Sequence, residues 1–265
     1  MLRLNNVHKI FNYGKLNENY VLKDINLQVT RGDFITIIGS NGAGKSTLLN
    51  LVAGTLFPEA GTVEINGQDV TNWPVHKRAH LIGRVFQNPL QGTAAEMTIE
   101  ENLSLAVKRG QARGLRLGLN KKRRTEFRRL LALLELGLEN RLECPVKLLS
   151  GGQRQALTLL MATIGHPQLL LLDEYTAALD PKTAQQIIAI TERIVAQHNL
   201  TVLMVTHDLR QSLTMGNRTL MMDQGKIILD LKGKERERMT VNELLAKFSA
   251  RSGRELTDDR ILLHG

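Results

Sequence analysis

A glycine-rich segment between a predicted strand and a predicted helix limits the fold of this chain more than any other feature. The segment GSNGAGKST, residues 39–47, follows the apolar run FITII and precedes the helical sequence TLLNLVAG. This order of strand, loop and helix is typical of a phosphate-binding loop, in which backbone N–H groups wrap phosphate oxygens. A structural glycine turn would not require Lys45 and Ser46 at these spacings. We therefore predict a nucleotide site here.

Each part of this loop has a predicted role. The glycines open the backbone to phosphate oxygens, Lys45 supplies positive charge to the β- and γ-phosphates, and Ser46 offers its hydroxyl to Mg²⁺. The nucleotide-binding residues expected from the loop are Gly39, Ser40, Asn41, Gly42, Ala43, Gly44, Lys45, Ser46 and Thr47.

A second motif, LLLLDE at residues 169–174, supplies two carboxylates. The leucines predict a buried strand that delivers Asp173 and Glu174 to the carboxyl edge of a parallel sheet, beside the phosphate loop in folds of this type. Asp173 is expected to hold Mg²⁺ through its water shell, and Glu174 to orient or deprotonate the attacking water. Adjacent carboxylates can also begin a capped loop, but a phosphate loop without a magnesium carboxylate would be incomplete.

The stretch LSGGQ, residues 149–153, precedes another predicted helix. Ser150 alone would cap that helix, so the glycines at 151 and 152 suggest close approach of an anion to its N-terminus. The residues by themselves leave open which anion this is.

The pattern around these motifs predicts an α/β protein. Residues 1–68 are rich in short strands, with Asn66-Gly67 as a hairpin signal, and strands return after Pro167 around a helix over residues 182–197. A second hairpin is expected around residues 223–226. Between the strand-rich parts, helical spacing places one set of apolar residues on one face: Phe127, Leu130, Leu131, Leu134 and Leu138.

Composition narrows the class of protein. The single cysteine, Cys144, excludes an internal disulfide or a cysteine zinc site and fits a reducing cytosol. No apolar run approaches the roughly 18 residues of a membrane span, and MLRLNNVHKI alternates where a secretory signal would be continuously apolar. We expect a subunit that does not itself cross the bilayer. The net charge of +9 is compatible with binding to nucleic acid, anionic lipid or a phosphorylated ligand, or with a cytoplasmic surface next to a membrane.

Together the motifs resemble those of the ATP-binding subunits of ABC transporters, across the chain to about Lys232. GSNGAGKST is similar to the family's Walker A motif, LLLLDE to Walker B and LSGGQ to the signature. Gln87 in GRVFQNP resembles the Q-loop glutamine, Asp180 in AALD the D-loop aspartate, and His207 in MVTHD the switch histidine. Phe11 in HKIFNYG matches the aromatic residue that stacks on adenine, with Tyr13 as its nearest competitor.

The resemblance implies a P-loop NTPase (RecA-like) α/β core with an N-terminal antiparallel β subdomain and an inserted α-helical subdomain. It implies an ABC ATPase domain over residues 1–232, with the helical subdomain at about 89–166. Beyond the resemblance, the polar sequence of residues 233–265 predicts a tail with one helix. The implied catalytic residues are Glu174, His207, Gln87 and Lys45, and the implied Mg²⁺ ligands are Ser46, Gln87 and Asp173. The implied contacts to ATP on a second subunit are Ser150, Gly151, Gly152, Gln153 and Asp180.

The same resemblance implies a homodimer with ATP and Mg²⁺ at its interface, so that the anion facing LSGGQ belongs to the partner subunit. It further implies a peripheral position on the cytoplasmic face of the membrane, bound to permease subunits and served by a solute-binding protein. We expect it to power import of a small solute such as an amino acid. The alternatives are an exporter ATPase and a soluble ABC ATPase acting on nucleic acid or ribosomes. Tyr175, where many relatives have proline, shifts the subfamily without removing a catalytic group.

The run at residues 108–129 is strongly basic, with Glu126 opposing ten lysines and arginines. Such a run can bind nucleic acid, but no aromatic residue other than Phe127 is available for base stacking, and its spacing puts Phe127 on the apolar face. We favour a solvated basic face near anionic lipid and predict no specific nucleic-acid partner.

Overall fold

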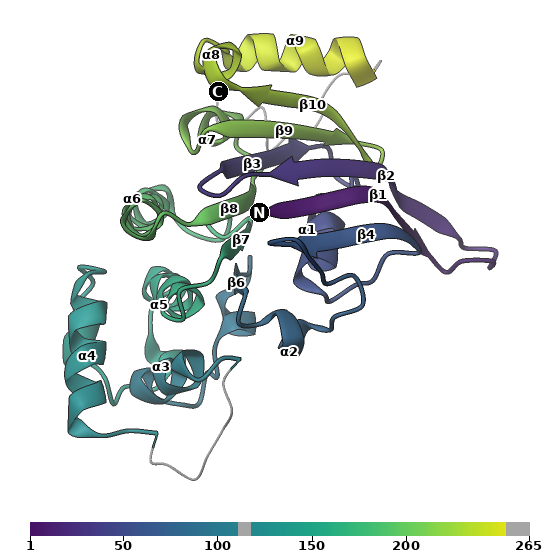
Figure 1. The fold of residues 1–265 in the computed structure, drawn as a ribbon. Coiled ribbons are helices and arrows are strands. Elements are labelled where there is room, and N and C mark those ends of the chain that lie inside the picture. The colour runs from purple at the N-terminus through teal and green to yellow at the C-terminus, as the bar shows by residue number, and fades with distance from the viewer. Residues whose placement is uncertain (111–117, 253–265) are drawn as a thin grey trace. The chain divides into compact units, whose positions relative to one another are not determined.

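The computed structural model describes residues 1–110 and 118–252. The chain divides into two compact units: unit 1 comprises Met1–Arg78 and Thr201–Gly265, and unit 2 comprises Ala79–Leu200 (Figure 1). Residues 111–117, which belong to the basic run, and residues 253–265, which belong to the predicted tail, lie outside the described residues.

Unit 1 contains an antiparallel sheet with the strand order β2-β1-β4-β5. Its strands are β1 (Leu2–Phe11), β2 (Asn19–Val29), β4 (Ala60–Ile65) and β5 (Gln68–Asp69). The predicted hairpin is confirmed, because Ile65 pairs with Gln68 across a turn in which Asn66 and Gly67 have φ of 52° and 76°. Positive φ at both turn residues is what a type I′ turn requires, and Asn-Gly meets it at low cost.

Unit 1 also contains the strands that present the phosphate loop: β3 (Phe34–Gly39), β8 (Thr201–Val205), β9 (Arg218–Asp223) and β10 (Lys226–Lys232). Within this unit β3 pairs in parallel with β8 and β9, and β10 pairs antiparallel to β9, as the second predicted hairpin requires. Every residue of β3 and β8 is buried. The helices of this part are α1 (Lys45–Ala53), α2 (Val75–Arg78) and α7 (Leu209–Thr214).

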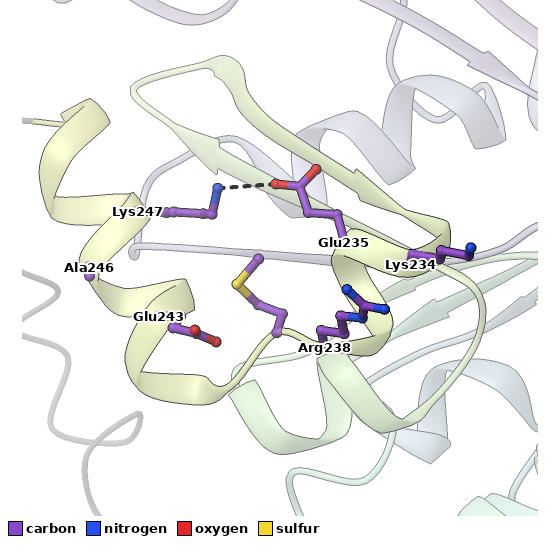
Figure 2. A pocket seen from close by; sticks show the side chains of 7 residues that line it. Lys234, Glu235, Arg238, Glu243, Ala246 and Lys247 are labelled. Carbon is purple, nitrogen blue, oxygen red and sulfur yellow. Dashed lines mark hydrogen bonds and ion pairs between the residues drawn. The ribbon is translucent and has the colours of Figure 1, made fainter.

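Within its described part, residues 233–252, the tail forms two helices where one was expected: α8 (Gly233–Glu237) and α9 (Val241–Ser252), which lies beside β10 (Figure 1). Leu244 and Phe248 of α9 are buried against a cluster that includes Met221 and Leu229. A cavity of about 490 Å³ lies between the two helices, where Lys247 and Glu235 form an ion pair of 3.0 Å (Figure 2).

Unit 2 combines two parallel strands with most of the helices. The strands are β6 (Ile82–Val85) and β7 (Leu169–Asp173), paired in register from Ile82 with Leu169 to Val85 with Leu172. The α-helices are α3 (Ile99–Val107), α4 (Lys121–Ala132), α5 (Gly151–Thr163) and α6 (Pro181–His198), and the short 3₁₀ helices are η1 (Pro89–Gly92), η2 (Leu138–Asn140) and η3 (Val146–Leu148). The helix predicted over residues 182–197 is confirmed.

The predicted apolar face after Phe127 is only partly helical. Phe127, Leu131, Leu134 and Leu138 are all buried, but α4 ends at Ala132. Glu135 and Gly137 then adopt φ of 56° and 70°, which a right-handed helix does not contain. The leucines share the core because of tertiary packing, so their spacing alone overestimated the length of the helix.

Among residues 1–110 and 118–252, no helix combines the length and apolar character needed to cross a membrane.

Candidate functional site

The residues expected to bind and hydrolyse ATP divide between the two units. Phe11, the loop at residues 39–47 and His207 belong to unit 1. The members in unit 2 are Gln87, Ser150, Gly151, Gly152, Gln153, Asp173, Glu174 and Asp180.

The phosphate loop begins where β3 ends and closes where α1 begins. Gly44 is the N-cap of α1, with φ of 98° and no side-chain cap hydrogen bond. The first N–H groups of a helix have no partner within it and carry partial positive charge, so an uncapped start is suited to a phosphate. Because α1 begins at Lys45, within the loop, its N-terminus lies at the phosphate site.

Two glycines of the loop are required by close packing. A Cβ on Gly39, whose φ is +148°, would lie 2.1 Å from the carbonyl oxygen of Met222 in the neighbouring strand β9. A Cβ on Gly44 would lie 2.7 Å from Leu22 Cδ2. A side chain at position 39 would displace the backbone of β9, and one at position 44 would push Leu22 aside and require a φ of +98°, which residues other than glycine rarely adopt.

Lys45 and Ser40 hold the loop in shape. Lys45 is 5% exposed, and its Nζ donates to the carbonyl oxygens of Gly39 at 2.7 Å and Ser40 at 3.0 Å. Ser40 Oγ donates to Asp223 Oδ1 at 3.2 Å. Sequence reasoning missed Asp223, although it ends an apolar strand at the carboxyl edge of the sheet, which is the signal that identified Asp173.

Phe11 and His207 are the other expected members in unit 1. Phe11 ends β1, and Lys9 Nζ lies 5.2 Å from the centre of its ring, whereas Tyr13 lies beyond the strand and is 73% exposed. His207 follows β8 directly after Thr206, whose Oγ1 donates to Gln211 Oε1 at 2.5 Å. The turn that carries His207 is therefore fixed at one side by a buried hydrogen bond.

The carboxylates in unit 2 lie at the end of β7. Glu174 has φ of 44°, a left-handed conformation that costs a non-glycine residue on the order of 1 kcal/mol and is concentrated at functional sites. Arg84 Nη2 approaches Asp173 Oδ2 at 3.5 Å. Burial lowers the pKa of Arg84, and the charge of Asp173 acts in the opposite direction. Sequence reasoning missed Arg84, because its position beside β7 follows from strand register.

Gln87 is exposed after β6 and is tied indirectly to the signature helix α5. Gln155 of α5 is 1% exposed, and its Nε2 donates to the carbonyl oxygen of Phe86 at 3.3 Å. Gln155 thus links the backbone next to Gln87 with α5. Sequence reasoning also missed this residue; its only signal is a glutamine within a buried apolar helix.

The signature begins α5 with a capping box. Ser150 Oγ accepts from the N–H of Gln153, and Gln153 Oε1 accepts from the N–H of Ser150, both at 3.2 Å. A Cβ on Gly152 would lie 2.2 Å from Thr183 Cγ2, whereas a Cβ on Gly151 would meet only Leu179, at 3.5 Å. Gly152 therefore has a packing reason within unit 2, and Gly151 is the glycine that leaves the exposed helix start open.

The side chain of Gln153 is used within its own unit. Its Nε2 donates to the carbonyl oxygen of Leu136, and its Oε1 accepts from Arg141 Nη1, both at 3.3 Å. These bonds fix the direction of the helix start. Asp180 caps α6 by accepting the N–H of Thr183 at 3.0 Å, and the hydrogen bonds from Thr183 lower the pKa of Asp180.

Tyr175 is 2% exposed and burial raises the pKa of its hydroxyl, so it stays neutral. Its ring is an internal packing element next to Glu174.

Comparison with known proteins gives a consistent family. A family model described as ABC transporter matches residues 22–177. The tyrosine transport ATP-binding protein of Clostridioides difficile (strain R20291) is 42% identical over 248 residues, which cover 94% of this chain and 98% of that protein. The spermidine/putrescine import ATP-binding protein PotA of Spiroplasma citri is 37% identical, and the match covers 86% of this chain and 60% of that longer protein.

A solved structure agrees with these sequence matches. The dimeric post-hydrolysis state of the ATP-binding cassette MJ0796, bound to ADP and Pi, superposes with a TM-score of 0.75 at 31% identity, covering 88% of this chain and 98% of that one. The fold is thus the ABC ATPase cassette, a P-loop α/β fold with an antiparallel β subdomain. Because the nucleotide motifs, the fold and a nearly full-length relative agree, this chain belongs to the ATP-binding subunits of ABC transporters, which hydrolyse ATP for transport.

Proposed function

We propose that this subunit powers the import of an amino acid, with tyrosine or a related aromatic amino acid as the first candidate, through a separate permease. The observation that carries the proposal is the nearly full-length similarity to a tyrosine transport ATP-binding protein. A second relative is also named for import, of spermidine and putrescine, which supports import over export.

The phosphate loop fits ATP. The packing at Gly39 and Gly44 excludes side chains from these two positions of the loop. Lys45 Nζ donates to two loop carbonyls, so its positive charge stays inside the loop. Mg²⁺ would be held by Ser46, Gln87 and Asp173. The described residues contain no cluster of three or more histidine, cysteine, aspartate or glutamate side chains suited to a metal. Mg²⁺ needs none here, because it is usually bound by one or two carboxylates together with water and phosphate oxygens.

The chain's own residues would divide the work of hydrolysis. When bound, Mg²⁺ neutralises charge on the phosphates. Glu174, held in its left-handed conformation after β7, orients the attacking water and accepts its proton, and His207 contacts the γ-phosphate from the turn after β8. Phe11 supports the adenine from the end of β1.

We propose a homodimer in which the signature of one subunit faces ATP on the other. The exposed, uncharged start of α5 at Ser150 and Gly151 supports this arrangement, because a helix N-terminus that a glycine leaves open to solvent attracts a phosphate. Asp180, exposed at the start of α6, would lie in the same interface.

We further propose that residues 1–232 form the ATPase domain, with the helical subdomain at 89–166 and the tail at 233–265. The subunit sits peripherally on the cytoplasmic face of the membrane beside its permease.

The basic run supports permease or lipid proximity over nucleic acid. Phe127 is fully buried and cannot stack on a base. Arg124 pairs with Glu100 at 2.7 Å and with Glu143 at 3.2 Å, so one of the cations of the run is already neutralised within unit 2.

The test is uptake in proteoliposomes that contain this subunit together with its permease and solute-binding protein. We expect ATP-dependent uptake of labelled tyrosine that unlabelled aromatic amino acids compete for and spermidine does not. The matched control is Glu174→Gln in the same complex, which should assemble without uptake. Outward movement of tyrosine, or uptake of polyamines alone, would contradict the proposal.

A further inference from the structure

A small polar pocket in unit 2 is used by none of the ATPase chemistry. It lies among the start of α3, α4 and the segment around η2, and it encloses about 230 Å³. Its charged lining residues are Glu100, Arg124, Arg128, Glu139 and Glu143.

Glu100 is buried in this pocket with only half of its carboxylate satisfied. The residue is 4% exposed, and its Oε1 accepts from Arg124 Nη2 at 2.7 Å. Its Oε2 is buried and has no hydrogen-bond partner among the residues that the structure describes. Burying a polar atom without a partner costs on the order of 1–3 kcal/mol, and more when the group is charged. Because Glu100 also lines the pocket, this unpartnered oxygen is available as an acceptor for a donor group that enters the pocket.

Helix capping does not account for Glu100. The capping box of α3 is formed by Thr98 and Glu101, in which Glu101 Oε2 accepts from the N–H of Thr98 at 2.7 Å. Glu100 is the next residue toward the N-terminus and turns its side chain to α4 instead. The two adjacent glutamates therefore have different roles, and only the role of Glu101 is explained by the helix.

The charges of the lining define the ligand. Arg124 is shared between Glu100 and Glu143, while Glu139 Oε2 is also buried and has no partner in the described part of the chain. The three glutamate carboxylates and two arginine guanidinium groups that line the pocket sum to a net charge of −1. The carboxylates do not form a set of three metal ligands, as far as the described residues go. An organic group with one positive charge and several N–H donors matches both the charge and the free acceptors.

We propose that this pocket binds a single ammonium or guanidinium group, with Glu100 Oε2 and Glu139 Oε2 as its acceptors. The group can be the end of a lysine or arginine side chain on a partner protein or a small free amine. The proposal does not depend on the transported solute or on the ATPase mechanism.

The test uses the full chain and three probes in saturation-transfer NMR titrations. Butylguanidinium presents the free head group, N-acetyl-arginine methylamide presents it on a peptide unit, and N-acetyl-citrulline methylamide has nearly the same shape without charge. We expect saturable binding of a charged probe with a dissociation constant on the order of 1 mM, and at least tenfold weaker binding of the citrulline probe. Binding of butylguanidinium without binding of the capped arginine would assign a small free cation, and binding of the capped arginine would assign a protein side chain.

Variants connect binding with the pocket. Glu100→Gln should weaken binding at least about tenfold, and Glu139→Gln should weaken it in the same direction without touching the ion pair to Arg124. Glu126→Gln, which changes an exposed residue of α4 outside the pocket lining, is the matched control and should bind like the wild type. The proposal is overturned if no charged probe saturates, if the citrulline probe binds as tightly as the arginine probe, or if both pocket variants bind like the control.

Discussion

Arg78 is expected to be one of the most important single residues for the stability of unit 1. Its side chain is completely buried at the end of α2 and donates five hydrogen bonds to five backbone carbonyls. The acceptors are Trp73 at 2.8 Å, Leu51 at 2.9 Å, Val52 at 2.7 Å, Val70 at 2.6 Å and Thr71 at 3.0 Å. Burial lowers the pKa of Arg78 to about 10, so the guanidinium remains charged at neutral pH.

The magnitude follows from these bonds. At about 1 kcal/mol for each lost hydrogen bond, the loss of five bonds in Arg78→Ala would lower the free energy of unfolding by about 5 kcal/mol. Water entering the emptied space recovers part of this loss, so we expect the free energy of unfolding to fall by about 3 kcal/mol or more. The free energy of unfolding of Arg78→Lys should lie between those of Arg78→Ala and the wild type. An ammonium group has three donors and can bond to at most three of the five carbonyls.

The assay is urea unfolding followed by the fluorescence of the single tryptophan, Trp73, whose own carbonyl accepts from Arg78. Lys77→Ala, at an exposed neighbouring position in the same short helix, is the matched control and should change the midpoint little. If Arg78→Ala unfolds at the same urea concentration as Lys77→Ala, the five-carbonyl reasoning is wrong.

Three further predictions follow from contacts that the sequence did not reveal. Arg84→Gln should lower the Mg²⁺ concentration that half-saturates the ATPase by roughly fivefold, because the guanidinium group that competes with Mg²⁺ for Asp173 is removed. An increase in this Mg²⁺ concentration would contradict the prediction. Gln155→Leu should lower kcat while ATP affinity in filter binding stays unchanged, because the link to Phe86 is lost; an unchanged kcat would contradict this role. Burial and the neighbouring His166 lower the pKa of His198 in the folded protein, so the unfolded protein binds this proton more readily and the free energy of unfolding falls as the pH drops below about 6.5. His166→Gln should make this fall smaller, as measured by urea unfolding at pH 5 and pH 7.

The phosphate loop could be predicted in detail because few backbone paths satisfy its glycine spacing. Gly39 and Gly44 are needed where the loop meets β9 and Leu22, and the Asn66-Gly67 turn is likewise a local solution. The glycine spacing of the loop and the Asn-Gly pair of the turn are each visible within a few neighbouring residues, so both features can be predicted before their packing partners are known.

The residues that were missed depend on segments distant in the sequence. Asp223 reaches Ser40 because β9 pairs with β3, and Arg84 reaches Asp173 because β6 pairs with β7. Strand order and register must be known before either contact can be deduced. The length of α4 was overestimated for a related reason: Leu138 is buried by tertiary packing and not by continuation of the helix.

The most direct test of the central claim, an ATPase whose dimer is held by ATP until Glu174 acts, is size-exclusion chromatography of Glu174→Gln with ATP and Mg²⁺. We predict a dimer peak and phosphate release below about one hundredth of the wild-type rate, because the amide cannot accept the proton of the attacking water. Glu192→Gln, at an exposed position of α6, is the control and should turn over ATP like the wild type. A monomer peak for Glu174→Gln together with wild-type phosphate release would contradict the account.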